Sequence, residues 1–319
     1  MTKVWTLARH EYQAAVRSKA LLALLATFII VTTVSILIAA FTFKSKLADY
    51  NTYKAAAQAA RQTYIAAPQL FPLQLLRGAI EYVEIIGSVI AIALGYVSVA
   101  RERSNRTMQL LLSRPVTTVQ LVSGRIFGAL CIFISIISVT GVIAVIAIGV
   151  IGNTWLTMGE LARLGIAYGL SVIYMLLFYC LGAILTLRSR APINGLITGF
   201  ALWLLIVMIM PQIGDTMDVD NQVPGGLFHA LQIQKSDERA ILAHFKTYET
   251  IRNDIEIASI EKHYERFNFA VTGIKDQYNQ RPLAEVVSAK RADLGWLGGA
   301  VVVLFGGLAL SMRRKHITR

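Results

Sequence analysis

Long apolar runs alternate with short polar stretches along this chain of 319 residues. Several runs reach the roughly 20 residues that a helix needs to cross the hydrocarbon core of a bilayer. None shows the alternation of a membrane-barrel strand, and a lipid-facing backbone must satisfy its own hydrogen bonds, so each run should be a helix. The pattern therefore predicts an all-α polytopic membrane protein. Its six predicted transmembrane helices are residues 20–43, 79–100, 126–151, 161–187, 193–210 and 294–312.

The segments on either side of the first span also have helical patterns. In residues 1–19 the apolar positions lie near one face, which predicts an N-terminal elbow helix in the membrane interface. The alternative is a basic flank that only orients the first span. Residues 44–78 are rich in alanine until Pro68 and Pro72 interrupt them. We expect the first helix to continue beyond the membrane and the chain to return along the surface.

The longest polar break is residues 211–293, which should form a helical extracytoplasmic insertion. It begins with turn formers and three aspartates between residues 215 and 220, which lack the spacing of an EF-hand loop. A calcium site there is the less favoured alternative, and no metal ligand is predicted. From about residue 236 to 264, apolar residues recur at three- and four-residue steps. This amphipathic piece needs a surface to cover, and the helix of residues 44–66 is the expected one.

Basic residues are concentrated in four segments, in which Glu11 and Glu102 are the only acids. The segments are residues 1–19, 101–125, 188–192 and 313–319. Because loops rich in Lys and Arg stay in the cytoplasm, both termini and both loops are predicted to be cytoplasmic, in a cell (inner) membrane. The resulting asymmetry accounts for the net charge of +12, which in a soluble protein would suggest nucleic acid. We expect no nucleic-acid partner.

The composition and motifs exclude several activities. With 55% hydrophobic and 16% charged residues, the chain is not a soluble globular domain. It has no P-loop, no H-E-x-x-H metalloprotease motif and no G-x-S-x-G nucleophile elbow. Few charges lie within the spans, which argues against a carboxylate relay for coupled transport. We expect no catalytic residue and no cofactor in this chain, so its energy must come from elsewhere.

Two features of the spans could carry function or packing. Glu81 and Glu84 begin the second span at i and i+3, and we expect them to contact the insertion or Arg77 rather than line a pathway through the outer leaflet. Pairs of glycines four residues apart permit close helix approach. These pairs are Gly124/Gly128, Gly165/Gly169, Gly195/Gly199 and Gly295/Gly299.

Residues 101–125 form a short basic segment between two spans, with three adjacent leucines that water would not solvate well. This segment resembles the first intracellular loop of ABC-2 type permeases. Arg106 stands where the family usually has glycine, and Arg125 where it usually has lysine. The matching residues are Glu102, Arg103, Thr107, Leu110, Leu111, Leu112, Pro115, Val116 and Gly124.

Residues 9–22 are similar to the elbow of the same family, in the six-helix branch that includes the nitrous-oxide-reductase maturation and gliding-motility permeases. The resemblance implies further cytoplasmic contacts near this elbow and the second cytoplasmic loop. Those residues are Arg9, Glu11, Arg17, Arg188 and Arg190.

The resemblance implies a half-transporter of an ABC exporter. Two copies, or one copy and a close relative, would bind cytoplasmic ATPase subunits that carry ATP and Mg²⁺. Residues 110–112 would fill an apolar groove on the ATPase, and Arg101, Glu102, Arg103 and Arg106 would make charge pairs around it. The pair would move a substrate, with membrane lipid and an extracytoplasmic protein as further candidate partners.

Two alternatives remain open. An ATP-driven mechanotransmitter would act on an extracytoplasmic partner without translocation. In the other, residues 101–125 are only a basic loop of an unrelated six-helix protein.

Overall fold

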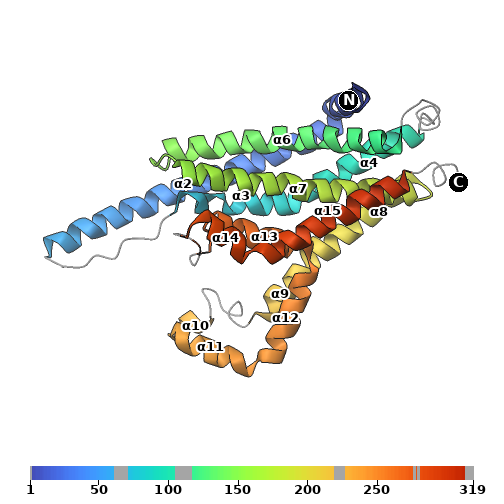
Figure 1. Ribbon diagram of the computed structural model, residues 1–319. Helices are drawn as coiled ribbons and strands as arrows, with labels where there is room; N and C mark the ends of the chain where they lie inside the picture. Colours follow the sequence, from blue (N-terminus) through green and yellow to red (C-terminus); the bar gives the residue numbers. More distant parts are fainter. Residues whose placement is uncertain are drawn as a thin grey trace.

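Long helices packed side by side make up the body of the computed structural model (Figure 1). The structure describes residues 2–60, 71–104, 117–218, 227–275, 278 and 281–312. Every regular element among these residues is helical, which confirms the predicted all-α class.

Within the described residues, six helical stretches are long and apolar enough to cross a membrane, so the predicted number of spans is confirmed. They are α2 (Lys19–Ala59), the stretch Pro72–Arg103, α6 (Thr118–Val150), α7 (Met158–Arg188), the stretch Pro192–Met217 and α15 (Arg291–Ser311).

The second and fourth spans form the centre of the bundle. In their most apolar windows, 67% of residues in the second span and 72% in the fourth are buried, against 17% in the fifth and sixth. Glycines allow this central pair to approach closely: a Cβ at Gly182 would lie 2.5 Å from the Ile92 carbonyl oxygen, and one at Gly95 would collide with the Tyr179 carbonyl. The fifth and sixth spans therefore leave most of their surface open.

The first span is a single uninterrupted helix. The Ser18 hydroxyl accepts a hydrogen bond from the Leu21 amide and caps its first turn. At a rise of 1.5 Å per residue, the 41 residues of α2 extend about 60 Å, roughly twice the hydrocarbon thickness. The helix therefore continues beyond any membrane that it crosses, and one end projects from the bundle in Figure 1.

Two of the spans change helix type part-way along. The second is built from the 3₁₀ segment η1 (Pro72–Leu76), α3 (Arg77–Tyr82), the π segment η2 (Val83–Gly87) and α4 (Ser88–Ser104). The fifth is built from α8 (Pro192–Trp203), the π segment η3 (Leu204–Ile209) and α9 (Met210–Met217).

The two π segments contact each other. Next to this contact, Trp203 Nε1 donates a hydrogen bond to Ser88 Oγ over 2.8 Å. π turns interrupt the regular side-chain rows of an α-helix. In both spans, the row of residues that faces the neighbouring helices therefore shifts at this level.

The described part of the chain between the fifth and sixth spans is mostly helical, as expected. Its elements are α10 (Leu227–Ala230), α11 (Lys235–His244), α12 (Lys246–Ala258), α13 (Ile260–Val271) and α14 (Leu283–Ala289). The prediction that residues 236–264 pack on the helix of residues 44–66 is wrong. α12 packs along α9 rather than along the extension of α2, and the two helices form an arm that leaves the bundle (Figure 1).

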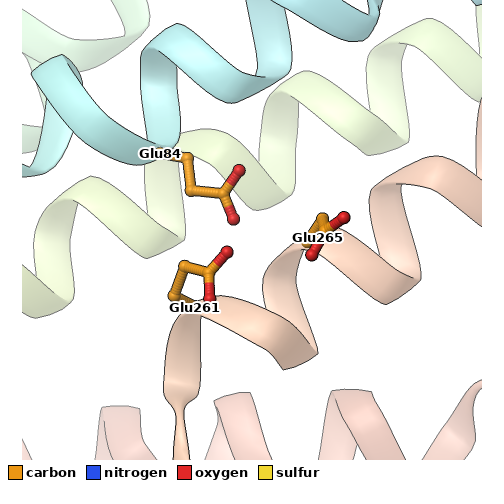
Figure 2. Close-up of side chains that lie close together, drawn as sticks. All are labelled: Glu84, Glu261 and Glu265. Carbon is orange, nitrogen blue, oxygen red and sulfur yellow. The ribbon is translucent and has the colours of Figure 1, made fainter. Parts of the chain in front are cut away.

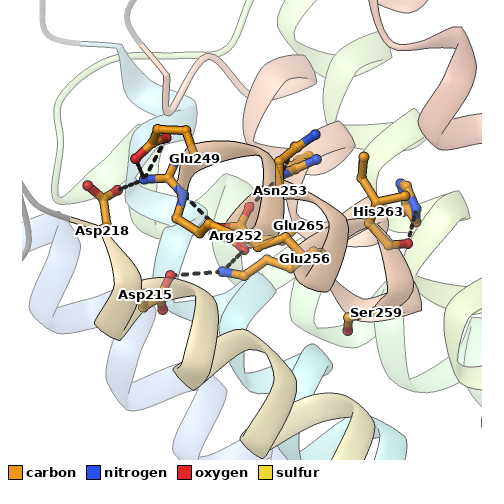
Figure 3. A network of polar contacts seen from close by, with 12 residues as sticks. Asp215, Asp218, Glu249, Arg252, Asn253, Glu256, Ser259, His263 and Glu265 are labelled. Carbon is orange, nitrogen blue, oxygen red and sulfur yellow. Dashed lines mark hydrogen bonds and ion pairs between the residues drawn. The ribbon is translucent and has the colours of Figure 1, made fainter. Parts of the chain in front are cut away.

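An ion pair helps to hold α12 beside α9: Arg252 of α12 lies 3.1 Å from Asp218, the residue that follows α9 (Figure 3). Lys262 Nζ of α13 adds a 3.4 Å contact with Asp215 of α9. Two of the three aspartates in the acidic turn therefore pair with cations of the insertion. The third, Asp220, lies outside the described residues.

α13 belongs to the predicted extracytoplasmic insertion, yet it is not separate from the transmembrane helices. It packs against α7 and α15 within the bundle, and Tyr264 and Phe267 are completely buried. Tyr264 stacks on Tyr174 of α7, and its hydroxyl shares a 2.7 Å hydrogen bond with Ser171. Polar residues alternate with these aromatic residues, so the sequence of α13 has the pattern of a surface helix. One of its polar faces is nevertheless buried in the bundle.

Candidate functional site

The elbow helix α1 (Thr2–Arg17) lies against the beginning of α6. The contact depends on a glycine pair: a Cβ at Gly124 would be 2.6 Å from the Leu7 Cβ, and one at Gly128 would be 2.7 Å from the Glu11 Cβ. The predicted close approach at Gly124/Gly128 is confirmed. Because these positions have no side chains, α1 can approach closely enough for Glu11 to face Arg125 of α6.

Arg125 is almost completely buried, at 1% exposure. Its Nη2 forms a very short ion pair with Glu102 of α4, and its Nη1 donates to the Ser98 carbonyl oxygen over 3.2 Å. Glu11 Oε1 lies 4.0 Å from Arg125 Nε. Burial raises the pKa of Glu11 and the charge of Arg125 opposes that rise. One guanidinium thus joins α1, α4 and α6.

A second arginine fixes the end of α4. Arg103 Nη1 donates hydrogen bonds to the carbonyl oxygens of Thr186 at 2.6 Å and Ser189 at 2.8 Å, and its Nη2 reaches the Arg190 carbonyl at 3.3 Å. These carbonyls belong to the last turn of α7 and the residues after it, where a cation is favourable for the helix dipole. The last turn of α4 is therefore held on both sides.

The residues fixed in this way are the two ends of the predicted ATPase-coupling loop. The central part of that prediction lies outside the described residues: Arg106, Thr107, Leu110, Leu111, Leu112, Pro115 and Val116. The expected charge pairs between an ATPase and Glu102 or Arg103 stay a prediction. Both side chains already have partners within the chain, so their first role is to position the loop.

Arg101 is the loop residue that faces a cavity. This hollow of about 550 Å³ lies between α1 and α4 and is also lined by His10, Arg17 and Tyr96. Arg101 Nη2 is buried and has no hydrogen-bond partner among the described residues. The hollow therefore has a basic lining next to the start of the coupling loop.

The other predicted cytoplasmic contacts are distributed around this end. Arg9 and Arg17 are exposed on α1. Arg188 Nε donates to Ser311 Oγ over 3.1 Å and so connects the ends of α7 and α15. Arg190 is exposed, and its carbonyl oxygen receives the bond from Arg103. Whether any of them contacts a partner stays a prediction.

The two glutamates of the second span have different surroundings. Glu81 forms a half-exposed 2.8 Å ion pair with Arg77, as the sequence suggested. Glu84 is only 5% exposed and points toward Glu261 of α13, with Glu265 beside them (Figure 2). The π segment η2 begins between the two residues, so their side chains point in different directions. Glu84 therefore makes the expected contact with the insertion, but in the interior.

The three carboxylates of Glu84, Glu261 and Glu265 are close enough to share one ligand, since an oxygen from each lies within 4.8 Å of the others. Lys262 Nζ neutralises part of this charge through a 2.8 Å contact with Glu265. Burial raises the pKa of Glu261 to about 7, although Glu84 and Lys262 act in the opposite direction. No sequence motif predicted this group.

The glycine pairs are confirmed in part. A Cβ at Gly195 would lie 2.5 Å from the Thr186 Cα, and one at Gly199 would be 3.0 Å from the Ile92 side chain. The remaining two pairs face open space, with nothing within 4 Å of an added Cβ. They are Gly165, Gly169, Gly295 and Gly299.

Comparison with known families decides the identity of the fold. The family described as ABC-2 family transporter protein matches residues 5–313. This chain belongs to the ABC-2 transporter family. It is therefore a membrane permease component of an ABC transporter, and the resemblance first seen in residues 9–22 and 101–125 extends over nearly the whole chain. A search of curated proteins found no match.

Membership of the ABC-2 family gives the Arg125 group a context. An ABC permease component works with an ATPase, and the loop that the sequence assigned to that contact begins and ends beside Arg125. In the sequence, Arg125 stands out only as a substitute for lysine in the loop motif. Its partners Glu11 and Ser98 belong to other helices, and no local signal connects them.

Proposed function

We propose that this ABC-2 permease is the membrane half of an exporter, and that it couples to separate cytoplasmic ATPase subunits through residues 101–125. The observation that carries this proposal is the buried Arg125 group. It joins α1, α4 and α6 at both ends of the loop. A force applied to the loop would move these three helices together, because separating them would leave buried charges without partners.

The proposed orientation places both termini and the loop in the cytoplasm of a cell (inner) membrane. The positive-inside bias supports it. In this orientation the group of Glu84, Glu261 and Glu265 is on the outer side of the bundle.

The exporter works as a pair of permeases, either two copies or this chain and a close relative. The open faces of the fifth and sixth spans support pairing, since 17% of their apolar windows is buried within one copy. Lipid covers whatever part of these faces a second copy does not. The substrate moves along the interface between copies, driven by ATP hydrolysis on the partner subunits and by two alternative packings of the helices.

The arm of α9 and α12 favours a second candidate function, transmission of force to an extracytoplasmic partner. The fifth span continues into α9 as one helical stretch, Pro192–Met217, and the ion pair between Arg252 and Asp218 ties α12 to the end of α9. Rotation of the span therefore carries the arm with it. A partner that binds the arm would receive the movement without any passage of substrate.

The proposed coupling is tested by substituting Leu111→Asp and purifying the full chain with its ATPase in mild detergent. A charge in an apolar groove should abolish association while the permease remains inserted. Leu111→Met is the matched control, because it preserves volume and polarity and should bind at the wild-type ratio. Wild-type binding by Leu111→Asp would show that this segment is not the coupling element.

A further inference from the structure

The carboxylates of Glu84, Glu261 and Glu265 form a cluster that neither the family nor the proposed coupling explains. Glu84 comes from the π segment of the second span, and the other two come from α13, roughly 180 residues further along the chain (Figure 2). We propose that this cluster is a binding site for a hard divalent cation, and specifically for Ca²⁺. The proposal rests on these side chains and is independent of ATPase coupling.

The spacing of the oxygens fits the ion. One carboxylate oxygen from each residue lies within 4.8 Å of the other two. Calcium binds oxygen at about 2.4 Å, so oxygens that share one ion lie no more than about 4.8 Å apart, as these do. Magnesium usually keeps several waters and takes only one or two carboxylates, whereas this cluster offers three. The donors are all oxygen, which suits Ca²⁺ rather than a softer metal.

Burial supplies a second, independent observation. Glu84 is 5% exposed, it points into the cluster, and its Oε1 has no hydrogen-bond partner in the part of the chain that the structure describes. A buried carboxylate oxygen without a partner is costly, and proteins normally satisfy such atoms. A cation between Glu84 and Glu261 would satisfy this oxygen and remove the repulsion between the two side chains.

The charge balance also favours a divalent ion. Lys262 pairs with Glu265 at 2.8 Å and with Asp215 at 3.4 Å, so its single charge is shared. When all three glutamates are ionised, one ammonium leaves about two negative charges in a poorly solvated space, and a divalent cation compensates them.

An additional polar side chain lies close by in sequence. Asn268 follows Glu265 by three residues on the same face of α13. It is fully buried, and neither its amide oxygen nor its nitrogen has a hydrogen-bond partner among the described residues. Calcium accepts amide oxygens and waters as further ligands, so this face of α13 has the polar character that such a site needs.

A bound ion would fasten α13 to the second span. Glu84 lies in the span whose other end carries Glu102, which is paired with Arg125. Calcium would thus fix the insertion to a helix that leads directly to the loop at the opposite end.

The test is direct binding of ⁴⁵Ca²⁺ from CaCl₂ to the full-length protein in detergent after EDTA treatment. We expect saturable binding of about one ion per chain. Glu84→Gln and Glu261→Gln should each lower the affinity about tenfold or more, since even residues that only support a ligand usually matter that much. Glu81→Gln is the matched control, three residues from Glu84 but paired with Arg77 outside the cluster, and should keep wild-type affinity.

A second measurement guards against variants that fail to fold. In EDTA, Glu84→Gln should unfold at the same temperature as the wild type or higher, because it removes a repulsive charge without changing shape. Added CaCl₂ should raise the unfolding temperature of the wild type and of Glu81→Gln only. The proposal is overturned if the wild type shows no saturable binding at millimolar CaCl₂, as expected for a proton shared between Glu84 and Glu261, or if both cluster variants bind as well as the wild type.

Discussion

The second span carries two buried charged groups with opposite designs. Near its C-terminal end, Glu102 meets Arg125, and the cation is surrounded by acceptors from α1 and α4. About 27 Å away along the same helix, Glu84 meets two further carboxylates and only a shared lysine. We call the first group complete because both of its carboxylates face the central guanidinium, although Arg125 Nε has no hydrogen-bond partner among the described residues. The second has one shared lysine for three glutamates, and we call it incomplete. The complete group holds α1, α4 and α6 together permanently. The incomplete group holds the second span and α13 together more or less strongly, depending on whether it binds a proton or a cation.

The sharpest way to break this comparison is to remove the cation from the complete group. Arg125→Met leaves Glu102 and Glu11 buried without their partner and should cost about 3–5 kcal/mol. Chemical unfolding of the purified permease measures the loss. Arg9→Met, at an exposed position of α1, is the control and should change the stability by less than about 0.5 kcal/mol. If the two variants are equally stable, the Arg125 group does not hold the three helices together.

The incomplete group predicts a dependence on pH when cations are removed. The pKa of Glu261 is raised from 4.5 to about 7, so the folded state keeps a proton that the unfolded state has lost. The stability should therefore fall as the pH rises from 4.5 to 7, by about 3 kcal/mol. The charged groups that face Glu261 are Glu84, Glu265, Lys262 and Asp215.

Unfolding in EDTA across this pH range checks the prediction, with Glu261→Gln as the reference that lacks the titrating group. Equal pH profiles for the two proteins would mean that Glu261 does not carry the excess charge. Calcium should flatten the wild-type profile, because it replaces the proton as the compensating charge.

A smaller effect concerns the contact that completes the first group. An added methyl at Gly128 would meet the Glu11 Cβ at 2.7 Å, whereas Gly165 has nothing within 4 Å. Gly128→Ala and Gly165→Ala gain the same helix propensity, so their difference isolates the clash between α1 and α6. We expect Gly128→Ala to be less stable than Gly165→Ala by about 1 kcal/mol. Equal melting temperatures would show that α1 moves away easily.

The sequence predicted the spans well, because a bilayer imposes a simple rule on length and polarity. Its apolar runs located the six helices, and the motif in residues 101–125 led to the ABC-2 family. The ends of the spans were less accurate. Helices such as α2 and α6 continue well past their apolar runs, since a helix does not end where the membrane does.

The charged groups could not be predicted, because each is assembled from side chains of several helices whose packing the local pattern does not specify. Glu102 has the same local pattern whether it faces an ATPase or Arg125, and the sequence analysis expected the former. Similarly, α13 alternates polar and aromatic residues in the manner of a surface helix. What the pattern does not reveal is that the polar face of α13 meets Glu84, because that contact depends on the chain returning to the bundle after α12 (Figure 1).

The hydrogen bond between Trp203 and Ser88 allows the intrinsic fluorescence of Trp203 to report on the contact between the second and fifth spans. The other three tryptophans, Trp5, Trp155 and Trp296, are more than half exposed, whereas Trp203 is partly enclosed where the two π segments touch. An indole that loses its acceptor changes its emission colour. Fluorescence of a variant that keeps Trp203 alone would therefore report, without any attached dye, when the second and fifth spans slide past each other.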